Sequence, residues 1–316
     1  MSIITVTLNP CIDRTITITK PIEIGGTHRV EKRREEVSGK GLNVSYLLKN
    51  WNLETKCVGL DFKGSGHIVK ETLDELEIPN ELLAVEGQVR CNIKVFDDAG
   101  KTMTEFNEKG FPISEKDYEQ FIGQMDKLLK EMAEDTILVL TGSVPPGVPT
   151  DVYKCIIQKA KARGIKTVLD ASGELIKCGV EALPFAMKPN KEELETLLEY
   201  KPDTMEEIAK ACKTLLDKGV EYICVTLGEK GAILACHEGI YKAEPLQLDV
   251  KGIQGAGDSV VAGMCVAIQE GKNAETILRY AMAAAGGSLL LEGTQMCRLE
   301  DFHRLLPEVK ITSLRV

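Results

Sequence analysis

The sequence contains no apolar run that approaches the roughly 20 residues a membrane-spanning helix needs. Its ten cysteines are scattered, and no two form a Cys-x-x-Cys pair, so neither a zinc site nor a redox pair is indicated. Positive charge is also in the minority, because 39 basic and 48 acidic residues give a net charge of -9. We therefore expect a cytoplasmic protein with reduced thiols and with neither a membrane nor a nucleic-acid partner.

Two common nucleotide-binding signatures are missing as well. The pattern Gly-x4-Gly-Lys-Ser/Thr occurs nowhere, which argues against a P-loop NTPase. The segment Lys63-Gly64-Ser65-Gly66 lacks the third glycine of Gly-x-Gly-x-x-Gly and does not follow the first strand. We interpret it as a turn and a helix start, which disfavours a dinucleotide-dependent dehydrogenase.

From about residue 136 onward, apolar strands alternate with helices. Strands are predicted at 136–141, 166–170, 185–188 and 222–226, and helices at 150–163, 191–198 and 204–218. This alternation predicts an α/β fold with a doubly wound, mainly parallel sheet flanked by helices. Such sheets bind ligands at the carboxyl ends of their strands, where the sequence places Ser143, Asp170, Asn190 and Gly228.

The first hundred residues show shorter and more polar strands. After a first strand at 3–8, strands are predicted at 15–19, 28–32, 92–97 and 101–106, and helices at 43–51 and 64–76. A turn at 98–100 joins the last two strands. We expect one domain over 1–316, with a small β-sheet lid formed by about 12–35 and 88–108. A closing lid excludes water, and its exposed edges favour a homodimer through the lid.

The most distinctive segment is Gly255-Ala256-Gly257-Asp258-Ser259, a tight loop that opens into an apolar helix. A helix start presents free N–H groups and the positive end of the dipole, so it favours a phosphate. A carboxylate there suits a general base that deprotonates a hydroxyl attacking phosphorus. The alternative is that Asp258 is only a helix N-cap.

The segment Ser38-Gly39-Lys40-Gly41-Leu42-Asn43 is a second glycine-rich loop that enters a helix. It is either a cradle for an anion or a polyol, or a plain loop with Asn43 as N-cap. Asp13 follows the first strand, where its carboxylate either accepts hydrogen bonds from sugar hydroxyls or forms a turn beside Pro10.

Three further patterns each allow a functional and a structural interpretation. Arg90, Asn92 and Lys94 share one face of a strand, which suits a sugar phosphate or a solvated face. Asn190 and Glu193 lie three apart at a helix start, which suits Mg2+ or a capping box. The segment 226–232 is either a nucleotide-binding loop or a tight turn.

Four motifs in this order resemble the ribokinase-like PfkB carbohydrate kinases. They are listed here: Gly39-Lys40-Gly41-Leu42-Asn43, Thr141-Gly142-Ser143-Val144-Pro145-Pro146-Gly147, Lys188-Pro189-Asn190-x-x-Glu193 and Gly255-Ala256-Gly257-Asp258. The resemblance covers essentially the whole chain, and within the family it is strongest to the branch of 1-phosphofructokinases and tagatose-6-phosphate kinases. It implies a kinase that uses ATP and Mg2+, with K+ as a further candidate ion.

The resemblance also implies a role for each matching position. Asp258 would be the catalytic base, and Gly255, Ala256 and Gly257 would form the anion hole. The acceptor would be bound by Asp13, Gly39, Lys40, Gly41, Asn43, Arg90, Asn92 and Ser143. ATP would be bound by Lys188, Asn190, Thr226, Gly228, Gly231, Gly255, Gly257, Gly286 and Ser288, and Mg2+ by Asn190 and Glu193, directly or through water.

The expected reaction is phosphorylation of a ketohexose monophosphate, with fructose 1-phosphate giving fructose 1,6-bisphosphate as the first choice. Arg90-x-Asn92-x-Lys94 and Phe106-Asn107-Glu108-x-Gly110 favour that acceptor. Residues 292–297 instead resemble the minor 6-phosphofructokinase, and a tagatose-6-phosphate kinase stays open. Gly252-Ile253-Gln254 departs from the polar residues that the family usually carries before the anion hole. A non-catalytic sugar-phosphate sensor is the alternative from a different class.

Overall fold

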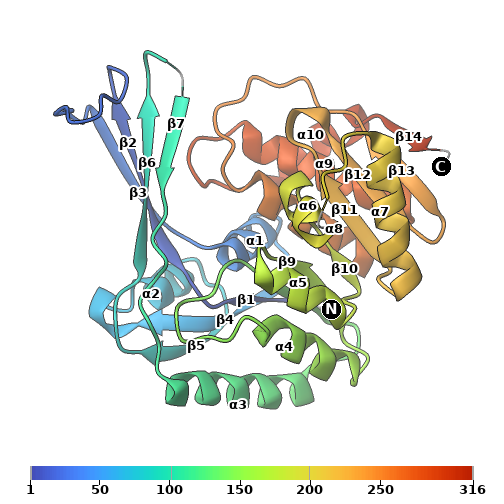
Figure 1. The fold of residues 1–316 in the computed structure, drawn as a ribbon. Coiled ribbons are helices and arrows are strands. Elements are labelled where there is room, and N and C mark those ends of the chain that lie inside the picture. Colours follow the sequence, from blue (N-terminus) through green and yellow to red (C-terminus); the bar gives the residue numbers. More distant parts are fainter. Residues whose placement is uncertain (1, 101, 199, 315–316) are drawn as a thin grey trace.

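A ten-stranded sheet runs through the centre of the computed structural model, which describes residues 2–100, 102–198 and 200–314 (Figure 1). Its strand order is β14 (Ile311–Leu314), β13 (Gly239–Ala243), β12 (Ala232–Cys236), β11 (Tyr222–Thr226), β10 (Ala186–Met187), β9 (Lys166–Asp170), β8 (Ile137–Thr141), β1 (Ile3–Thr7), β4 (Thr55–Phe62) and β5 (Asn80–Val85). The strands from β11 to β5 are parallel, and β12, β13 and β14 add an antiparallel end.

Helices cover both faces of this sheet because its central strands are apolar on both sides. In β8, Leu138 and Leu140 pack into one core, whereas Ile137 and Val139 pack into the other. The first core includes side chains of α2 (Ile68–Glu75), α3 (Glu115–Glu131), α4 (Val152–Lys161), α5 (Glu174–Glu181), α6 (Lys191–Leu198) and α7 (Met205–Lys218). The second includes α1 (Lys40–Asn50), α8 (Ala256–Gln269), α9 (Ala274–Leu289) and α10 (Leu299–Leu305).

Three short 3-10 helices complete the helical elements of the described residues. They are η1 (Lys63–Ser65), η2 (Gly228–Lys230) and η3 (Leu306–Glu308). Within the described parts of the chain, every helix is too short or too polar to cross a bilayer.

A separate four-stranded sheet stands beside the main one, at the left of Figure 1. We call it the lid sheet. Its order is β3 (Lys32–Ser38), β2 (Cys11–Ile18), β6 (Arg90–Asp97) and β7 (Thr102–Phe106), with β2 and β6 parallel and both outer pairs antiparallel. β2 leaves the carboxyl end of β1 after only three residues, so the lid sheet is tied directly to the ligand-binding edge of the main sheet.

The architecture agrees with the predicted fold class, but some element boundaries differ. The strand predicted at 28–32 is wrong, because residues 26–31 form no strand and β3 runs from Lys32 to Ser38. The run of charged side chains in β3 hides the alternation of apolar and polar residues from which a strand is predicted. The helix predicted at 64–76 is shorter, since α2 begins at Ile68 after η1. Residue Lys101, the predicted start of the last lid strand, lies outside the described residues.

Candidate active site

The N-terminus of α8, which we call the anion site, presents free N–H groups that could hold an anion. Gly255 is the N-cap, with φ of +70°, and no side chain caps the helix. The positive φ favours glycine at this position, and a Cβ atom there would also lie 2.4 Å from Cε of Met296. The first N–H groups of a helix have no intrahelical acceptor, and these also lack a side-chain cap. The loop can therefore donate several hydrogen bonds to one phosphate.

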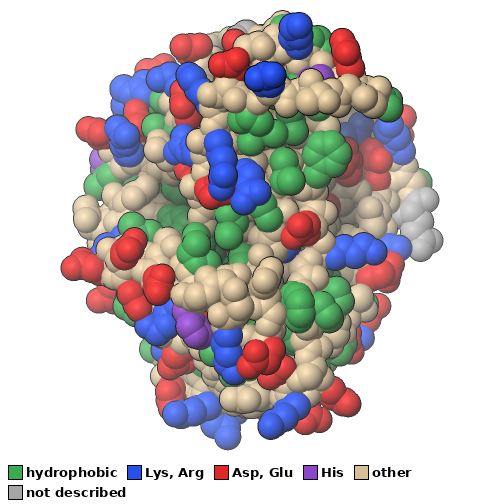
Figure 2. All heavy atoms as spheres, turned by 90° about the vertical axis from the view of Figure 1, so that its left-hand side faces the viewer, with side chains coloured by type: hydrophobic (Ala, Val, Ile, Leu, Met, Phe, Trp, Pro, Cys, Tyr) green, Lys and Arg blue, Asp and Glu red, His purple; other side chains and the backbone are tan. Residues whose placement is uncertain are grey.

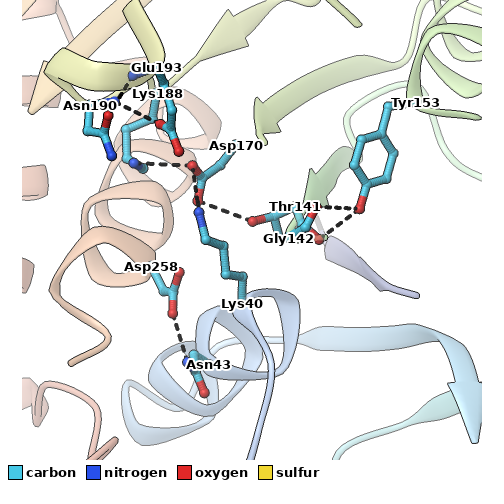
Figure 3. Close-up of polar contacts among 10 residues, drawn as sticks. All are labelled: Lys40, Asn43, Thr141, Gly142, Tyr153, Asp170, Lys188, Asn190, Glu193 and Asp258. Carbon is cyan, nitrogen blue, oxygen red and sulfur yellow. Dashed lines mark hydrogen bonds and ion pairs between the residues drawn. The ribbon is translucent and has the colours of Figure 1, made fainter. Parts of the chain in front are cut away.

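Asp258 lies in the first turn of α8 but does not cap the helix. Its Oδ2 accepts a hydrogen bond from Nδ2 of Asn43 at 2.7 Å, across the interface between α8 and α1 (Figure 3). Burial raises the pKa of Asp258 to about 6. Lys40 and Asn43 lower that pKa without cancelling the rise. The carboxyl group is therefore ionised at neutral pH and close to the pKa that suits a general base.

Asp170 connects two lysines that are distant in the sequence. Nζ of Lys40 lies 3.2 Å from its Oδ2, and Nζ of Lys188 lies 3.2 Å from its Oδ1 (Figure 3). Asp170 also accepts from the hydroxyl of Thr141 at 3.2 Å. Burial alone would raise the pKa of this fully buried carboxyl, but Lys188 and Lys40 hold it below its usual range. The position of Asp170 at a strand end did not by itself indicate this role.

Lys188 belongs to the anion site at α8. It follows β10 and is 3% exposed, and its Nζ would lie 3.7 Å from a Cβ atom placed on Gly257. A buried ammonium group beside free helix N–H groups adds full positive charge where a phosphate would bind. Asp170 partly balances that charge at 3.2 Å.

A second cationic site opens on the other side of Asp170. It is a cavity of about 150 Å3 lined by Thr7, Asn9, Lys40, Arg90, Thr141, Gly142, Ser143 and Ser172. Arg90 is held by the carbonyl oxygens of Asn9 at 3.2 Å and Glu108 at 3.0 Å. Thr7 Oγ1 and Asn9 Oδ1 are buried there without a hydrogen-bond partner. Two cations and several hydroxyl groups in one cavity suit a second phosphate.

Asp13 sits on the inner face of the lid sheet, where Asn92 and Lys94 meet it. Nδ2 of Asn92 donates to its Oδ1 at 3.0 Å, and Nζ of Lys94 to its Oδ2 at 2.9 Å. Asn92 and Lys94 are 7% and 6% exposed, so the alternative of a solvated strand face is wrong for both. Burial alone would raise the pKa of Asp13, but Lys94 and Asn92 lower it.

The glycines of the early loop allow α1 to start very close to β1. A Cβ atom at Gly41 would lie 2.3 Å from Oγ1 of Thr7, and one at Gly39 would lie 3.0 Å from Cγ2 of the same residue. This close approach brings Lys40 to the cavity and Asn43 to Asp258. Asn43 is not an N-cap, because the N-cap of α1 is Gly39.

Asn190 and Glu193 form the capping box that was the alternative to a metal site. Each accepts from the backbone N–H of the other at 2.8 Å. Among the described residues, no group of three His, Cys, Asp or Glu side chains is placed to hold a metal on its own. Glu193 nevertheless keeps one carboxylate oxygen outside the box, which fits Mg2+ that shares its coordination with phosphates and water.

The predicted nucleotide residues fall into two groups. The backbone of Thr226, at the end of β11, forms an isolated parallel β-bridge with that of Asn190. A Cβ atom at Gly228 in η2 would meet open space. Gly231 packs against Ala243 of β13. Thr226 thus lies next to Asn190 at the carboxyl edge of the sheet.

Gly286 and Ser288 are buried within α9. A Cβ atom at Gly286 would lie 2.6 Å from Leu246, within the packing of α9. Ser288 is 1% exposed, and its hydroxyl group contacts that of Ser259 at 2.7 Å. Because Ser259 donates to the carbonyl oxygen of Gly255 at 2.9 Å, Ser288 supports the anion site from behind.

An open helix N-terminus with a buried carboxyl and ammonium group has the chemistry that phosphoryl transfer to a hydroxyl requires. The model of the pfkB family carbohydrate kinases matches residues 6–301. The chain therefore belongs to the pfkB family of carbohydrate kinases.

Individual relatives agree with this assignment. The 1-phosphofructokinase of Bacillus subtilis (strain 168) is 34% identical over 99% of this chain and 100% of that protein. Phosphofructokinase-2 from Escherichia coli in complex with potassium has a TM-score of 0.89 and 25% identity, over 97% of this chain and 98% of that one. A tetrameric inhibited form of that enzyme has a TM-score of 0.85 and 25% identity, over the same shares. The predicted family, branch and fold class are thus confirmed.

Proposed function

We propose that the protein transfers the γ-phosphoryl group of ATP to the free primary hydroxyl group of fructose 1-phosphate, giving fructose 1,6-bisphosphate and ADP. The observation that carries the proposal is the presence of two separate cationic sites. One lies at the N-terminus of α8 with Lys188, and the other is the cavity with Lys40 and Arg90. A kinase for an unphosphorylated sugar needs only the first, whereas a sugar phosphate also occupies the second.

The acceptor spans the space between the cavity and Asp258. Its phosphate is held by Lys40, Arg90 and Ser143, which line the cavity. Its hydroxyl groups are bound by Asp13 and Asn43, which reach the same edge from the lid sheet and from α1. The B. subtilis relative supports fructose 1-phosphate as the acceptor.

The chemical step places the reacting hydroxyl group beside Asp258. The carboxylate takes the hydroxyl proton while the oxygen attacks the γ-phosphorus, and the bond from that phosphorus to the bridging oxygen of ADP breaks. The N–H groups of Ala256 and Gly257 and the ammonium group of Lys188 donate to the transferred group and stabilise its charge. Asn43 holds the carboxylate of Asp258 in place at 2.7 Å.

The donor end lies along Thr226, Gly228 and Asn190. Mg2+ bound together with ATP would neutralise part of the phosphate charge, and Asn190 and Glu193 are the residues that would hold it, directly or through water. K+ is a further candidate ion, supported by the potassium in the E. coli structure. Oε1 of Gln254, directly before the anion site, is buried without a hydrogen-bond partner and is available to a cation.

The lid sheet is the proposed interface of a homodimer. β3 and β7 are its edge strands, and all of β7 is exposed. Phe106 pairs with Ile93 on the face opposite Lys94, and its side chain is 56% exposed. Figure 2 shows hydrophobic side chains gathered on the side of the molecule that carries the lid sheet. Pairing two lids would cover both the edges and this apolar surface.

The acceptor is tested by ADP release with Mg-ATP and three sugar phosphates in parallel. We expect kcat/KM for fructose 1-phosphate to exceed the values for fructose 6-phosphate and tagatose 6-phosphate by at least about tenfold. A preference for either 6-phosphate would overturn the acceptor and keep the mechanism. No turnover in protein that still binds ATP would support the sensor. Parallel assays in KCl and NaCl test the ion.

Asp258→Asn should lower kcat by roughly 10²–10⁴-fold, because the variant cannot accept the hydroxyl proton. The variant should fold, and its free energy of unfolding at pH 8 should equal or exceed that of the wild type, since burial disfavours the charged carboxylate. Steady-state kinetics and urea unfolding measure the two effects. Retention of more than about a tenth of the activity contradicts the base role.

The pKa of Asp258 predicts the pH dependence of kcat. Only the ionised carboxylate accepts a proton, so kcat should be constant above pH 7 and fall below the pKa of about 6. Asn43→Ala removes a hydrogen bond that lowers this pKa, so the midpoint should move to higher pH. An unchanged midpoint in the variant would assign the titration to the substrate phosphate instead.

Phe106→Glu should weaken the proposed homodimer, because it places a charge on the exposed apolar face of the lid sheet. Sedimentation at micromolar concentration should show a dimer for the wild type and a monomer for the variant. Tyr200→Glu is the matched control, since Tyr200 is an exposed aromatic residue outside the lid sheet. A monomeric wild type would remove the interface.

A further inference from the structure

We infer that Lys94 is a positioning residue for the acceptor sugar, which acts by holding the Asp13 carboxylate ionised and in one orientation. The inference rests on the proposed function, since it assumes that Asp13 binds the hydroxyl groups of the acceptor. It assigns Lys94 a different role from that of Lys40 and Arg90, which face the acceptor phosphate.

Lys94 is buried in a way that few lysines are. The residue is 6% exposed, and its ammonium group lies 2.9 Å from Oδ2 of Asp13, which is itself 4% exposed. A lysine that loses its hydration without a charged partner is strongly disfavoured. Lys94 and Asp13 therefore form a buried ion pair, and neither is a free surface charge.

The strand register of the lid sheet makes this contact obligatory. Asp13 in β2 is the parallel partner of Asn92 in β6, and Lys94 is two residues further along, on the same face. Asn92 and Lys94 thus approach the carboxylate from one strand, and each donates a hydrogen bond to a different oxygen of it. The main chain of the lid sheet fixes both contacts.

The hydrogen bonds that each oxygen of the Asp13 carboxylate already accepts show which oxygen is left for the sugar. Oδ1 accepts from Asn92 at 3.0 Å and from the thiol of Cys11 at 3.4 Å, so both of its lone pairs are used. Burial and the charge of Asp13 keep that thiol protonated, with its pKa raised to about 12. Oδ2, the oxygen held by Lys94, is therefore the acceptor for a sugar hydroxyl group.

The other groups around Asp13 cannot replace the charge of Lys94. Ser38 of β3 donates its hydroxyl hydrogen to Asn43 at 3.2 Å, and although it also lowers the pKa of Asp13, it carries no charge. Glu36, opposite Asp13 in β3, is engaged by Arg34 at 2.7 Å and by the N–H of Thr294 at 2.9 Å. Arg90 bonds carbonyl oxygens on the far side of Asn92. Without Lys94, burial would raise the pKa of Asp13.

The test compares Lys94→Met with Asp13→Asn and with the double variant. We expect Lys94→Met to raise KM for the sugar phosphate by at least about tenfold and to leave KM for Mg-ATP within about twofold. The double variant should match Asp13→Asn alone, because Lys94 acts only through Asp13. Lys94→Arg should retain most of the affinity, and Lys32→Met, at the exposed start of β3, is the control.

A second measurement does not depend on turnover. In protein labelled with 13C at the aspartate carboxyl groups, Lys94→Met should show, besides Asp258 near pH 6, a further carboxyl group whose pKa lies above the usual range of an aspartate, because burial then acts on Asp13 without the opposing charge of Lys94. The wild type and the double variant should lack it. Its absence from Lys94→Met, additive effects in the double variant, or an equal rise in both KM values would overturn the inference. If Lys94→Met shows this signal but the wild type turns over no sugar phosphate, the result would instead contradict the proposed function.

Discussion

The buried carboxylate of Asp170 is the interaction on which the site depends. It holds Lys40 and Lys188 at 3.2 Å each, with one lysine on the acceptor side and the other at the N-terminus of α8. Two ammonium groups this close to each other repel unless an opposite charge lies between them. Asp170 supplies that charge and leaves both lysines with hydrogens for phosphate oxygens. The proposed donor and acceptor sites thus share one carboxylate.

The same neighbourhood gives three carboxyl groups different tasks. Asp170 has its pKa lowered by two lysines and stays ionised. Burial raises the pKa of Asp258 to about 6 and also raises that of Glu193. The pKa of Asp258 thereby suits proton transfer. The raised pKa of Glu193 means that its ionised form would be favoured by a cation bound beside it. The environment of each group, and not its residue type, separates the roles.

The lid sheet repeats this principle at smaller scale. Asp13 is ionised because Lys94 is buried against it, in a sheet that packs on the acceptor side of the site. The lid sheet is also linked to the far side of the site, since Glu36 accepts from the N–H of Thr294 at 2.9 Å. Met296, in the same segment, packs on Gly255. The lid sheet and the loop before α8 are therefore linked through residues 294–296, which favours their moving as a unit.

The sequence by itself determined the local features of this protein. The alternation of apolar strands and helices predicted the doubly wound sheet, and Gly255-Ala256-Gly257-Asp258 predicted a phosphate-binding helix start, because each element or motif is encoded by consecutive residues. Contacts between distant segments were decided only by the tertiary structure. Lys40 meets Asp170 across 130 positions, and Asn43 meets Asp258 across 215. Propensity and spacing carry no information at that range, so the role of Asp170, the burial of Lys94 and the supporting place of Ser288 followed from packing alone.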